Sequence, residues 1–370
     1  MNRESVRKCA TFDVQEWVKQ IEEGAGKNYH RYAKLLELTL QSGEAQVGQT
    51  PKEVIWSINK TKLYRFTPVK EKLFPVPVLM IYALINRPYV LDLHPGNSMV
   101  EYLVNRGFDV YMLDWGYPGP EDKDMKFDDY VLDQIPRAVQ LALRTSGAKE
   151  LSILGYCMGG TIATLYAATH PQAPIHDLIL LASPIDFADA GAYTTWLNGK
   201  YFHVDKMVDT MGNIPPDMID FGNKMLKPVT NFVSSWVNLY DRVWDEKFVF
   251  GWQKMNKWIN DGIAFPGEAF RQWIKELYQN NKLIKGEFKM RGRAAKLENI
   301  KCRVLNFAGE RDHIVPIQQS RTLPQFISSK DYEFISLPAG HVSLVTGRLA
   351  SKQVYPKIAG WLQAGQEIGE

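Results

Sequence analysis

Short, mostly apolar runs recur along the chain from residue 51 onward, with helical stretches between them. The runs are KLYRFTP, PVPVLMIYALI, GFDVYMLDWG, ELSILGY, DLILLAS, CRVLNFAGE and YEFISLPAG. The stretches between them include NSMVEYLVNR and FDDYVLDQIPRAVQLALRT, which are amphipathic. Strands that are apolar on both faces and alternate with such helices are typical of a mostly parallel sheet covered by helices on both sides. The sequence therefore predicts an α/β fold with its active site at the carboxyl ends of the strands.

This alternation stops between residues 187 and 290, where the sequence is helical, aromatic and punctuated by proline and glycine. Six of the ten tryptophans lie there: Trp196, Trp236, Trp244, Trp252, Trp258 and Trp273. An insertion at this point of an open sheet would lie over the carboxyl edge of the strands. We therefore expect residues 187–290 to form a cap over a catalytic core made of residues 51–186 and 291–370. The aromatic residues can also form the small core of the cap itself, and both interpretations can hold together.

Residues 1–50 differ from both of these regions. The stretches VQEWVKQIEE and YAKLLELTLQ carry apolar residues at helical spacing beside charged ones, which predicts a helical N-terminal flank. The flank is either a solvated helical segment or a surface for a partner chain.

The composition excludes several classes of function. Hydrophobic residues make up 45% of the 370 residues and charged residues 23%, which is typical of a globular protein. The net charge of +3 and the lack of a basic run interleaved with aromatic residues argue against nucleic-acid binding. Three cysteines, without CxxC spacing, predict neither a disulfide framework nor a zinc site and fit the reducing cytoplasm. The N-terminus lacks a signal-peptide core, and no run approaches the roughly 18 apolar residues of a membrane span. We therefore expect a cytoplasmic protein without a metal or cofactor.

The stretch LSILGYCMGGTIATLYAATH, residues 151–170, predicts a buried strand, a sharp glycine turn and a helix. A strand–Gly–x–nucleophile–x–Gly–helix turn is the nucleophile elbow of the α/β hydrolases, here with Cys157 at the apex. Gly155 and Gly159 leave room for the strained turn, and Gly160 lets the helix pack closely on the sheet. The N-terminus of the helix should favour the thiolate form of Cys157. A cysteine in such a turn can also be only a buried structural residue, and a phosphate-binding loop lacks its motif.

The remainder of the chain favours the catalytic interpretation of Cys157. In such hydrolases the nucleophile is followed along the chain by an acid and then by a histidine, each on a loop after a later strand. Asp312 follows CRVLNFAGE by a few residues, and His341 follows YEFISLP. We therefore expect Cys157 to attack the substrate, His341 to take the thiol proton, and Asp312 to orient the imidazole.

Other histidines and cysteines are weaker candidates for this chemistry. His313 competes with His341 for the role of base, but it directly follows the acid, so we expect it to play a supporting part. His94, in DLHPGN, is interpreted as a loop histidine. The remaining residues are interpreted as surface, cap or passive side chains: His30, His170, His176, His203, Cys9 and Cys302.

Acyl transfer also requires N–H donors for the negatively charged oxygen of the tetrahedral intermediate. We expect one donor at the backbone of Met158, directly after the nucleophile. The second is expected from the loop after PVPVLMIYALINRP, at Ala83 or Leu84. A thiolate attacks a thioester readily and forms another thioester at little cost in free energy. Cys157 in place of a serine therefore indicates transfer of acyl groups from a thioester carrier.

The motif LGYCMGG resembles the lipase-like box of the polyhydroxyalkanoate synthases, in which cysteine replaces the usual serine. The similarity covers nearly the whole chain from about residue 45 onward. It includes TPKEVIWSINKTKLYRF, LINRPYVLDLHPGNSMVEYLVNRGFDVYMLDWG, GNIPPDMIDFGNKMLKPVTNF and FPGEAFRQWIKELYQNNKLIKGE. The chain lacks the long N-terminal domain of the larger synthases, which resembles the two-subunit types. The cap stretches are most similar to class IV, with class III next.

This resemblance implies an α/β-hydrolase fold with a mobile cap. It also implies polymerisation of (R)-3-hydroxyacyl-coenzyme A, typically 3-hydroxybutyryl-coenzyme A, into a polyester with release of coenzyme A. The catalytic residues of the family fall on Cys157 in GYCMGG, Asp312 in GERDHIVP and His341 in PAGHVSLV. Its implied partners are a small R-type subunit, or an E-type subunit in class III, in a homodimer or hetero-oligomer on cytoplasmic polyester granules. A cysteine-dependent thioesterase or esterase of the same fold is the alternative, and a granule-associated protein without activity is a remote one.

Overall fold

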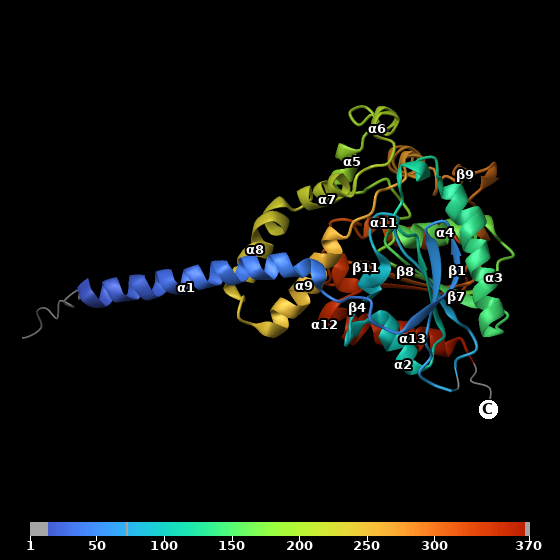
Figure 1. Ribbon diagram of the computed structural model, residues 1–370. Helices are drawn as coiled ribbons and strands as arrows, with labels where there is room; N and C mark the ends of the chain where they lie inside the picture. Colours follow the sequence, from blue (N-terminus) through green and yellow to red (C-terminus); the bar gives the residue numbers. More distant parts are fainter. Residues whose placement is uncertain (1–13, 72, 367–370) are drawn as a thin grey trace, which may run out of the picture.

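An eight-stranded sheet forms the centre of this computed structural model, which describes residues 14–71 and 73–366 (Figure 1). In spatial order its strands are β1 (Lys52–Ile58), β2 (Thr61–Phe66), β6 (Val110–Asp114), β3 (Val78–Ile81), β7 (Leu151–Tyr156), β8 (Ile175–Leu181), β11 (Arg303–Gly309) and β12 (Tyr332–Leu337). The pairs β1–β2 and β2–β6 are antiparallel, and all other neighbouring strands are parallel. The carboxyl ends of the six strands from β6 to β12 therefore meet at one edge.

Burial explains the apolar character of the strands. Every residue of β3, β6 and β7 is buried, because helices cover both faces of the sheet. Figure 1 shows α2 (Met99–Arg106) and α13 (Tyr355–Ala364) on one side, and α3 (Ile135–Ser146) and α4 (Met158–Thr169) on the other. The predicted α/β fold is thus confirmed. The sequence analysis did not identify β1, an antiparallel edge strand in which every residue is exposed or half-buried.

Residues 187–290 leave the sheet after β8 and consist of helices joined by turns and loops. These are α5 (Ala192–Trp196), α6 (Val204–Met211), α7 (Pro216–Met225), η5 (Val229–Ser234), α8 (Ser235–Asp241), α9 (Glu246–Asn260), α10 (Gly267–Arg271) and η6 (Gln272–Gln279). The chain then passes through the short strands β9 (Lys289–Met290) and β10 (Arg293–Ala294) and returns to the sheet as β11.

The N-terminal region contains one long helix, α1 (Val14–Gln41). Near its end, Leu38 is buried in a small cluster with Leu239, Val243 and Val249, which come from α8, α9 and the turn between them. This cluster is separate from the main hydrophobic core. Before that contact the helix extends away from the sheet (Figure 1), and Tyr29, one of its side chains, is 72% exposed.

Close backbone contact fixes the start of α4 against the end of β3. A Cβ atom on Gly159 would lie 2.3 Å from the carbonyl oxygen of Ile81 and 2.7 Å from the carbonyl carbon of Tyr82. A Cβ atom on Gly155, in β7, would lie 2.4 Å from Cα of Gly160. Only glycine fits at these positions, because the atoms in the way belong to backbone that cannot move without displacing the strand.

We expect Gly159→Ala to lower the free energy of unfolding by about 3 kcal/mol, since the added methyl group must separate α4 from β3. Urea unfolding followed by circular dichroism would measure the change. Gly360→Ala is the matched control, because Gly360 lies inside α13 with no atom within 4 Å of its Cβ position. That control should be neutral or stabilising by up to about 1 kcal/mol. Equal effects of the two substitutions would contradict the packing argument.

Candidate active site

Cys157 lies at the apex of the turn between β7 and α4, with φ 55° and ψ −130°. A side-chain-bearing residue held in this region costs about 1–3 kcal/mol, and such strain concentrates at functional sites. The backbone N–H of Cys157 donates to the carbonyl oxygen of Leu181 at 2.9 Å, which ties the apex to β8. The half-buried thiol is free. The turn thus presents one sulfur atom above the carboxyl edge of the sheet.

Asp312 and His341 lie on the loops that follow β11 and β12, and both side chains are buried. Nδ1 of His341 and Oδ2 of Asp312 are 2.7 Å apart. The other carboxylate oxygen of Asp312 accepts hydrogen bonds from the backbone N–H groups of Ile314 and Val315, both at 2.9 Å. These two bonds fix the carboxylate, so that its remaining oxygen faces the imidazole.

Two opposing effects set the pKa of His341. Burial lowers it, but the charges of Asp312 and Cys157 and hydrogen bonds to both side chains raise it, and the net pKa lies well above the usual value. These three side chains therefore form one chain, in which His341 is hydrogen-bonded to Asp312 and lies close enough to Cys157 for the thiol to raise its pKa. In such a chain the imidazole can accept the thiol proton, and the carboxylate stabilises the imidazolium that results.

Tyr156, which precedes the nucleophile, also contacts this chain, and the sequence analysis did not identify it. Its hydroxyl donates to the carbonyl oxygen of His341 at 3.4 Å, and the two rings lie 5.1 Å apart between centroids. The side chain is fully buried. It therefore supports His341 from the side of the strand. No sequence signal distinguishes this tyrosine from any other apolar strand residue.

His313 lies apart from the hydrogen bond between Asp312 and His341. Its Nδ1 is buried without a hydrogen-bond partner, and its side chain faces a cavity. Burial lowers the pKa of His313, and the positive charge of Lys227 lowers it further. The two neighbouring histidines therefore have pKa values shifted in opposite directions.

The other histidines and cysteines lie elsewhere. Nδ1 of His94 is 2.9 Å from the carbonyl oxygen of Pro95, and its ring packs on Phe250. Burial, together with the charge of Asp177, raises the pKa of the Cys302 thiol to about 12, which makes it unreactive. Cys9 lies outside the described residues. The remaining ones line neither cavity at Cys157: His30, His170, His176 and His203.

Two of the three residues proposed as backbone donors line a cavity together with Cys157. Met158 is the first residue of α4, and its side chain lines a cavity with Cys157. Ala83 follows β3 and lines a second cavity that also contains Cys157. Leu84 is buried and lines neither cavity. The contact of Gly159 with the end of β3 brings the two segments together.

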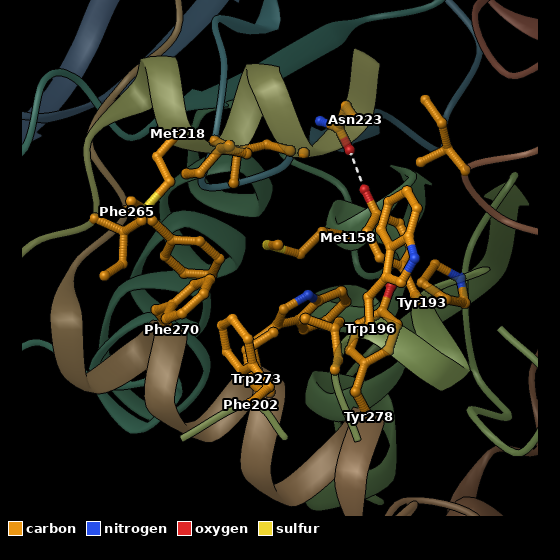
Figure 2. A pocket seen from close by; sticks show the side chains of 18 of the residues that line it. Met158, Tyr193, Trp196, Phe202, Met218, Asn223, Phe265, Phe270, Trp273 and Tyr278 are labelled. Carbon is orange, nitrogen blue, oxygen red and sulfur yellow. Dashed lines mark hydrogen bonds between the residues drawn. The ribbon is translucent and has the colours of Figure 1, made fainter. Parts of the chain in front are cut away.

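Two cavities meet at Cys157. The first, of about 470 Å³, is lined mainly by aromatic and aliphatic side chains of the cap. Figure 2 labels ten of the residues that line it: Met158, Tyr193, Trp196, Phe202, Met218, Asn223, Phe265, Phe270, Trp273 and Tyr278. Its main polar groups, the Tyr193 hydroxyl and the Asn223 side-chain oxygen, are hydrogen-bonded to each other at 2.5 Å (Figure 2). We call it the apolar cavity.

The second cavity has a volume of about 700 Å³ and a mixed lining. His341 and His313 face it, together with polar and charged side chains: Asn86, Asp220, Lys224, Asn231, Ser235, Ser343, Thr346 and Arg348. We call it the polar cavity. Ile219 and Asn223, both on α7, line both cavities and so form part of the boundary between them.

Two further observations concern the part of the chain that the structure describes. It contains no group of three or more His, Cys, Asp or Glu side chains placed to bind a metal ion. None of its helices is both long enough and apolar enough to cross a membrane.

Comparisons with known proteins agree with this geometry. The α/β-hydrolase fold family matches residues 76–347, and the family of the poly-beta-hydroxybutyrate polymerase (PhaC) N-terminus matches residues 9–103. The poly(3-hydroxyalkanoate) polymerase subunit PhaC of Synechocystis sp. is 36% identical over 333 residues, covering 88% of this chain and 88% of that protein. PhaC of Haloferax mediterranei is 36% identical over 88% of this chain and 66% of that protein. Among solved structures, a thermophilic esterase from Thermogutta terrifontis has a TM-score of 0.50 at 15% identity, over 86% of this chain and 100% of that chain.

The opposite pKa shifts of the two histidines predict opposite pH dependences of stability. His341 has a folded pKa above its unfolded value of about 6.5, so its contribution is complete below pH 6.5 and is lost as the pH rises through the folded pKa. His313 has a folded pKa below the unfolded value, so its contribution is present above pH 6.5 and is lost as the pH falls. Urea unfolding of His341→Gln and His313→Gln between pH 5 and pH 9 would measure each contribution, as the difference in the free energy of unfolding between the variant and wild type. The difference from wild type should shrink with rising pH for His341→Gln and grow with rising pH for His313→Gln; the same trend in both would contradict the assignment.

Proposed function

This chain belongs to the PhaC family of poly(3-hydroxyalkanoate) polymerases, within the α/β-hydrolase fold, and from that membership we propose that it polymerises (R)-3-hydroxyacyl groups from coenzyme A thioesters into a polyester. It is an acyltransferase that releases coenzyme A, and 3-hydroxybutyryl-coenzyme A is the proposed typical substrate. One observation supports the proposal at the level of chemistry: Cys157 lies where two cavities meet, and its charge and that of Asp312 both raise the pKa of His341, which is hydrogen-bonded to Asp312.

The first half of the proposed cycle acylates the enzyme. His341 takes the proton of the Cys157 thiol, and the sulfur attacks the carbonyl carbon of the substrate thioester. The backbone N–H of Met158, with that of Ala83 or Leu84, stabilises the oxygen of the tetrahedral intermediate. The bond from the carbonyl carbon to the coenzyme A sulfur then breaks, and His341 returns the proton to the departing thiolate. One thioester replaces another, so the step is nearly balanced in free energy.

The second half extends the polymer. The 3-hydroxyl group of a monomer or of the growing chain end gives its proton to His341 and attacks the acyl group on Cys157. An oxygen ester forms, the bond to Cys157 breaks, and the proton passes from His341 to the thiolate. Asp312 keeps the imidazole oriented through both halves. These steps use only side chains and the substrate's own thioester, so we propose no cofactor.

The apolar cavity suits the acyl group and the emerging chain. Its aromatic lining supplies surface for an apolar polyester, and its position next to Cys157 shields the acyl-enzyme from water. We propose that the helices of residues 187–290 act as a cap that opens to admit substrate and release polymer. Exposed apolar side chains of this region, such as Phe221 on α7 and Trp244 in the turn between α8 and α9, would contact the polyester, and we propose that the enzyme lies on cytoplasmic granules.

We expect Cys157→Ala to abolish coenzyme A release and polymer formation while leaving the free energy of unfolding within about 1 kcal/mol of wild type. Cys157→Ser should also be severely impaired, because a hydroxyl has a far higher pKa than a thiol. His341→Gln should lower the rate by about 10²–10⁴. Mass spectrometry after brief exposure to 3-hydroxybutyryl-coenzyme A should find an acyl adduct on Cys157 in the wild type only.

Two results would contradict this mechanism. Substantial polymer formation by Cys157→Ala would show that another residue is the nucleophile. Release of coenzyme A with free 3-hydroxybutyrate as the product, and without polymer, would identify the chain as a cysteine-dependent thioesterase.

We further propose that a small partner subunit, of the R type or else of the E type, activates this chain within a homodimeric or hetero-oligomeric enzyme. Relatives of similar length are named as subunits. Apolar side chains exposed on α1, such as Tyr29 and Leu40, offer a surface for a partner, and α1 contacts α8 and α9 of the cap. A partner that binds the open cap more tightly shifts its population by that difference in affinity.

The isolated chain should therefore release coenzyme A slowly, and titration with the small subunit should raise the rate. Limited proteolysis should show a changed cleavage pattern within residues 187–290 when the two proteins are mixed. Serum albumin at the same concentration is the control for non-specific effects. Full activity of the isolated chain, with no change on addition of the subunit, would contradict the proposal.

A further inference from the structure

We infer that the polar cavity binds the coenzyme A part of the substrate and that Arg348 binds its phosphate groups. This inference rests on the proposed function, because it takes the substrate to be a coenzyme A thioester. It assigns opposite sides of Cys157 to the two ends of that thioester: coenzyme A in the polar cavity and the acyl group in the apolar one.

The position of His341 determines which side the leaving group takes. The departing sulfur must receive a proton from the group that took it from Cys157, so it must lie within hydrogen-bond reach of the imidazole. His341 lines the polar cavity and does not line the apolar one. The coenzyme A sulfur, and the pantetheine arm attached to it, therefore lie in the polar cavity.

The lining of the apolar cavity supports the same orientation. No Lys, Arg, Asp or Glu side chain lines it, and its Tyr193 hydroxyl is already bonded to Asn223. Burying a phosphate there without a cation would cost far more free energy than the apolar contacts return. The polar cavity instead contains hydroxyl, amide and cationic groups, and it is the larger of the two.

Arg348 is the cation in the polar cavity best placed to meet phosphate. Its side chain is exposed to solvent and has no carboxylate or other side-chain partner among residues 14–71 and 73–366. Lys224, which also lines this cavity, is paired with Asp220 at 2.6 Å, so its charge is largely neutralised. A guanidinium group can bind phosphate through two parallel hydrogen bonds, which a carboxylate partner would otherwise occupy.

The loop that carries Arg348 also carries His341. Residues 341–349 continue from the base to the short helix α12 (Gly347–Leu349), and residues along this loop line the polar cavity. The N–H of Gly347 donates to Oδ1 of Asn97 at 2.7 Å, which anchors the loop next to Arg348 to the β4–β5 hairpin (Asp92–His94 and Asn97–Ser98). The base that meets the sulfur and the cation that meets the phosphates are thus held by one anchored segment.

The experiment compares two thioesters of 3-hydroxybutyrate, one with coenzyme A and one with N-acetylcysteamine, which lacks the phosphates. For Arg348→Gln, the ratio of kcat/KM between the coenzyme A thioester and the truncated thioester should fall about tenfold or more, mainly through a higher KM. Arg348→Lys should recover part of that ratio. Arg144→Gln removes an exposed arginine of α3 that lines neither cavity and should leave the ratio unchanged.

A binding measurement tests the same inference without turnover. Calorimetric titration of Cys157→Ala with free coenzyme A should give a Kd about tenfold lower than that of Cys157→Ala/Arg348→Gln. This readout separates the inference from the proposed function, whose own failure would appear as a wild-type enzyme that makes polymer from neither thioester. Equal losses with both thioesters would show that Arg348 only positions the His341 loop, and an unchanged Kd for coenzyme A would show that Arg348 does not bind the phosphates. Either result would overturn the inference.

Discussion

The contact between the first turn of α4 and the end of β3 is the constraint on which the site depends. Because Gly159 touches the backbone of Ile81 and Tyr82, the helix begins directly above the sheet and Cys157 is held in a strained conformation. That conformation lifts the sulfur above the carboxyl edge, where the loops after β11 and β12 bring Asp312 and His341. With a wider turn the thiol would lie within the core and could not meet an imidazole from another loop.

The position of the thiol also explains why two cavities are needed. Each round of the proposed cycle brings charged, hydrophilic coenzyme A and an apolar polyester chain to the same sulfur atom. A single cavity could bind only one of them well. An apolar cavity disfavours the phosphate groups of coenzyme A, and a hydrated polar cavity lets water hydrolyse the acyl-enzyme. The boundary is formed in part by α7, through Ile219 and Asn223, so residues of the 187–290 segment separate the two environments.

The sequence was sufficient to predict the parts of this protein that follow from local pattern and chain order. Buried parallel strands appear as continuous apolar runs, and the order Cys157, Asp312, His341 together with their places after strands indicated where they would lie. β1 was missed because an edge strand is at most half-buried and this one begins with two charged residues, so it lacks the long apolar run of a buried strand. The pair Tyr193–Asn223 could not be predicted, because it joins α5 and α7, whose relative placement depends on tertiary packing of the cap. Arg348 gave no signal either, since an arginine is recognisable as unpaired only when its neighbours are known.

The small cluster around Leu38 affects the order in which parts of the molecule unfold. It shares no residues with the main core, so breaking it exposes only a small group of side chains, among them Phe248 and Trp252, and leaves the sheet intact. The local free energy that holds α1 to α8 and α9 is therefore much smaller than the global free energy of unfolding. Amide hydrogens of α1 can exchange with solvent through this partial opening long before those of β7 do, while the strands that hold Cys157 stay intact.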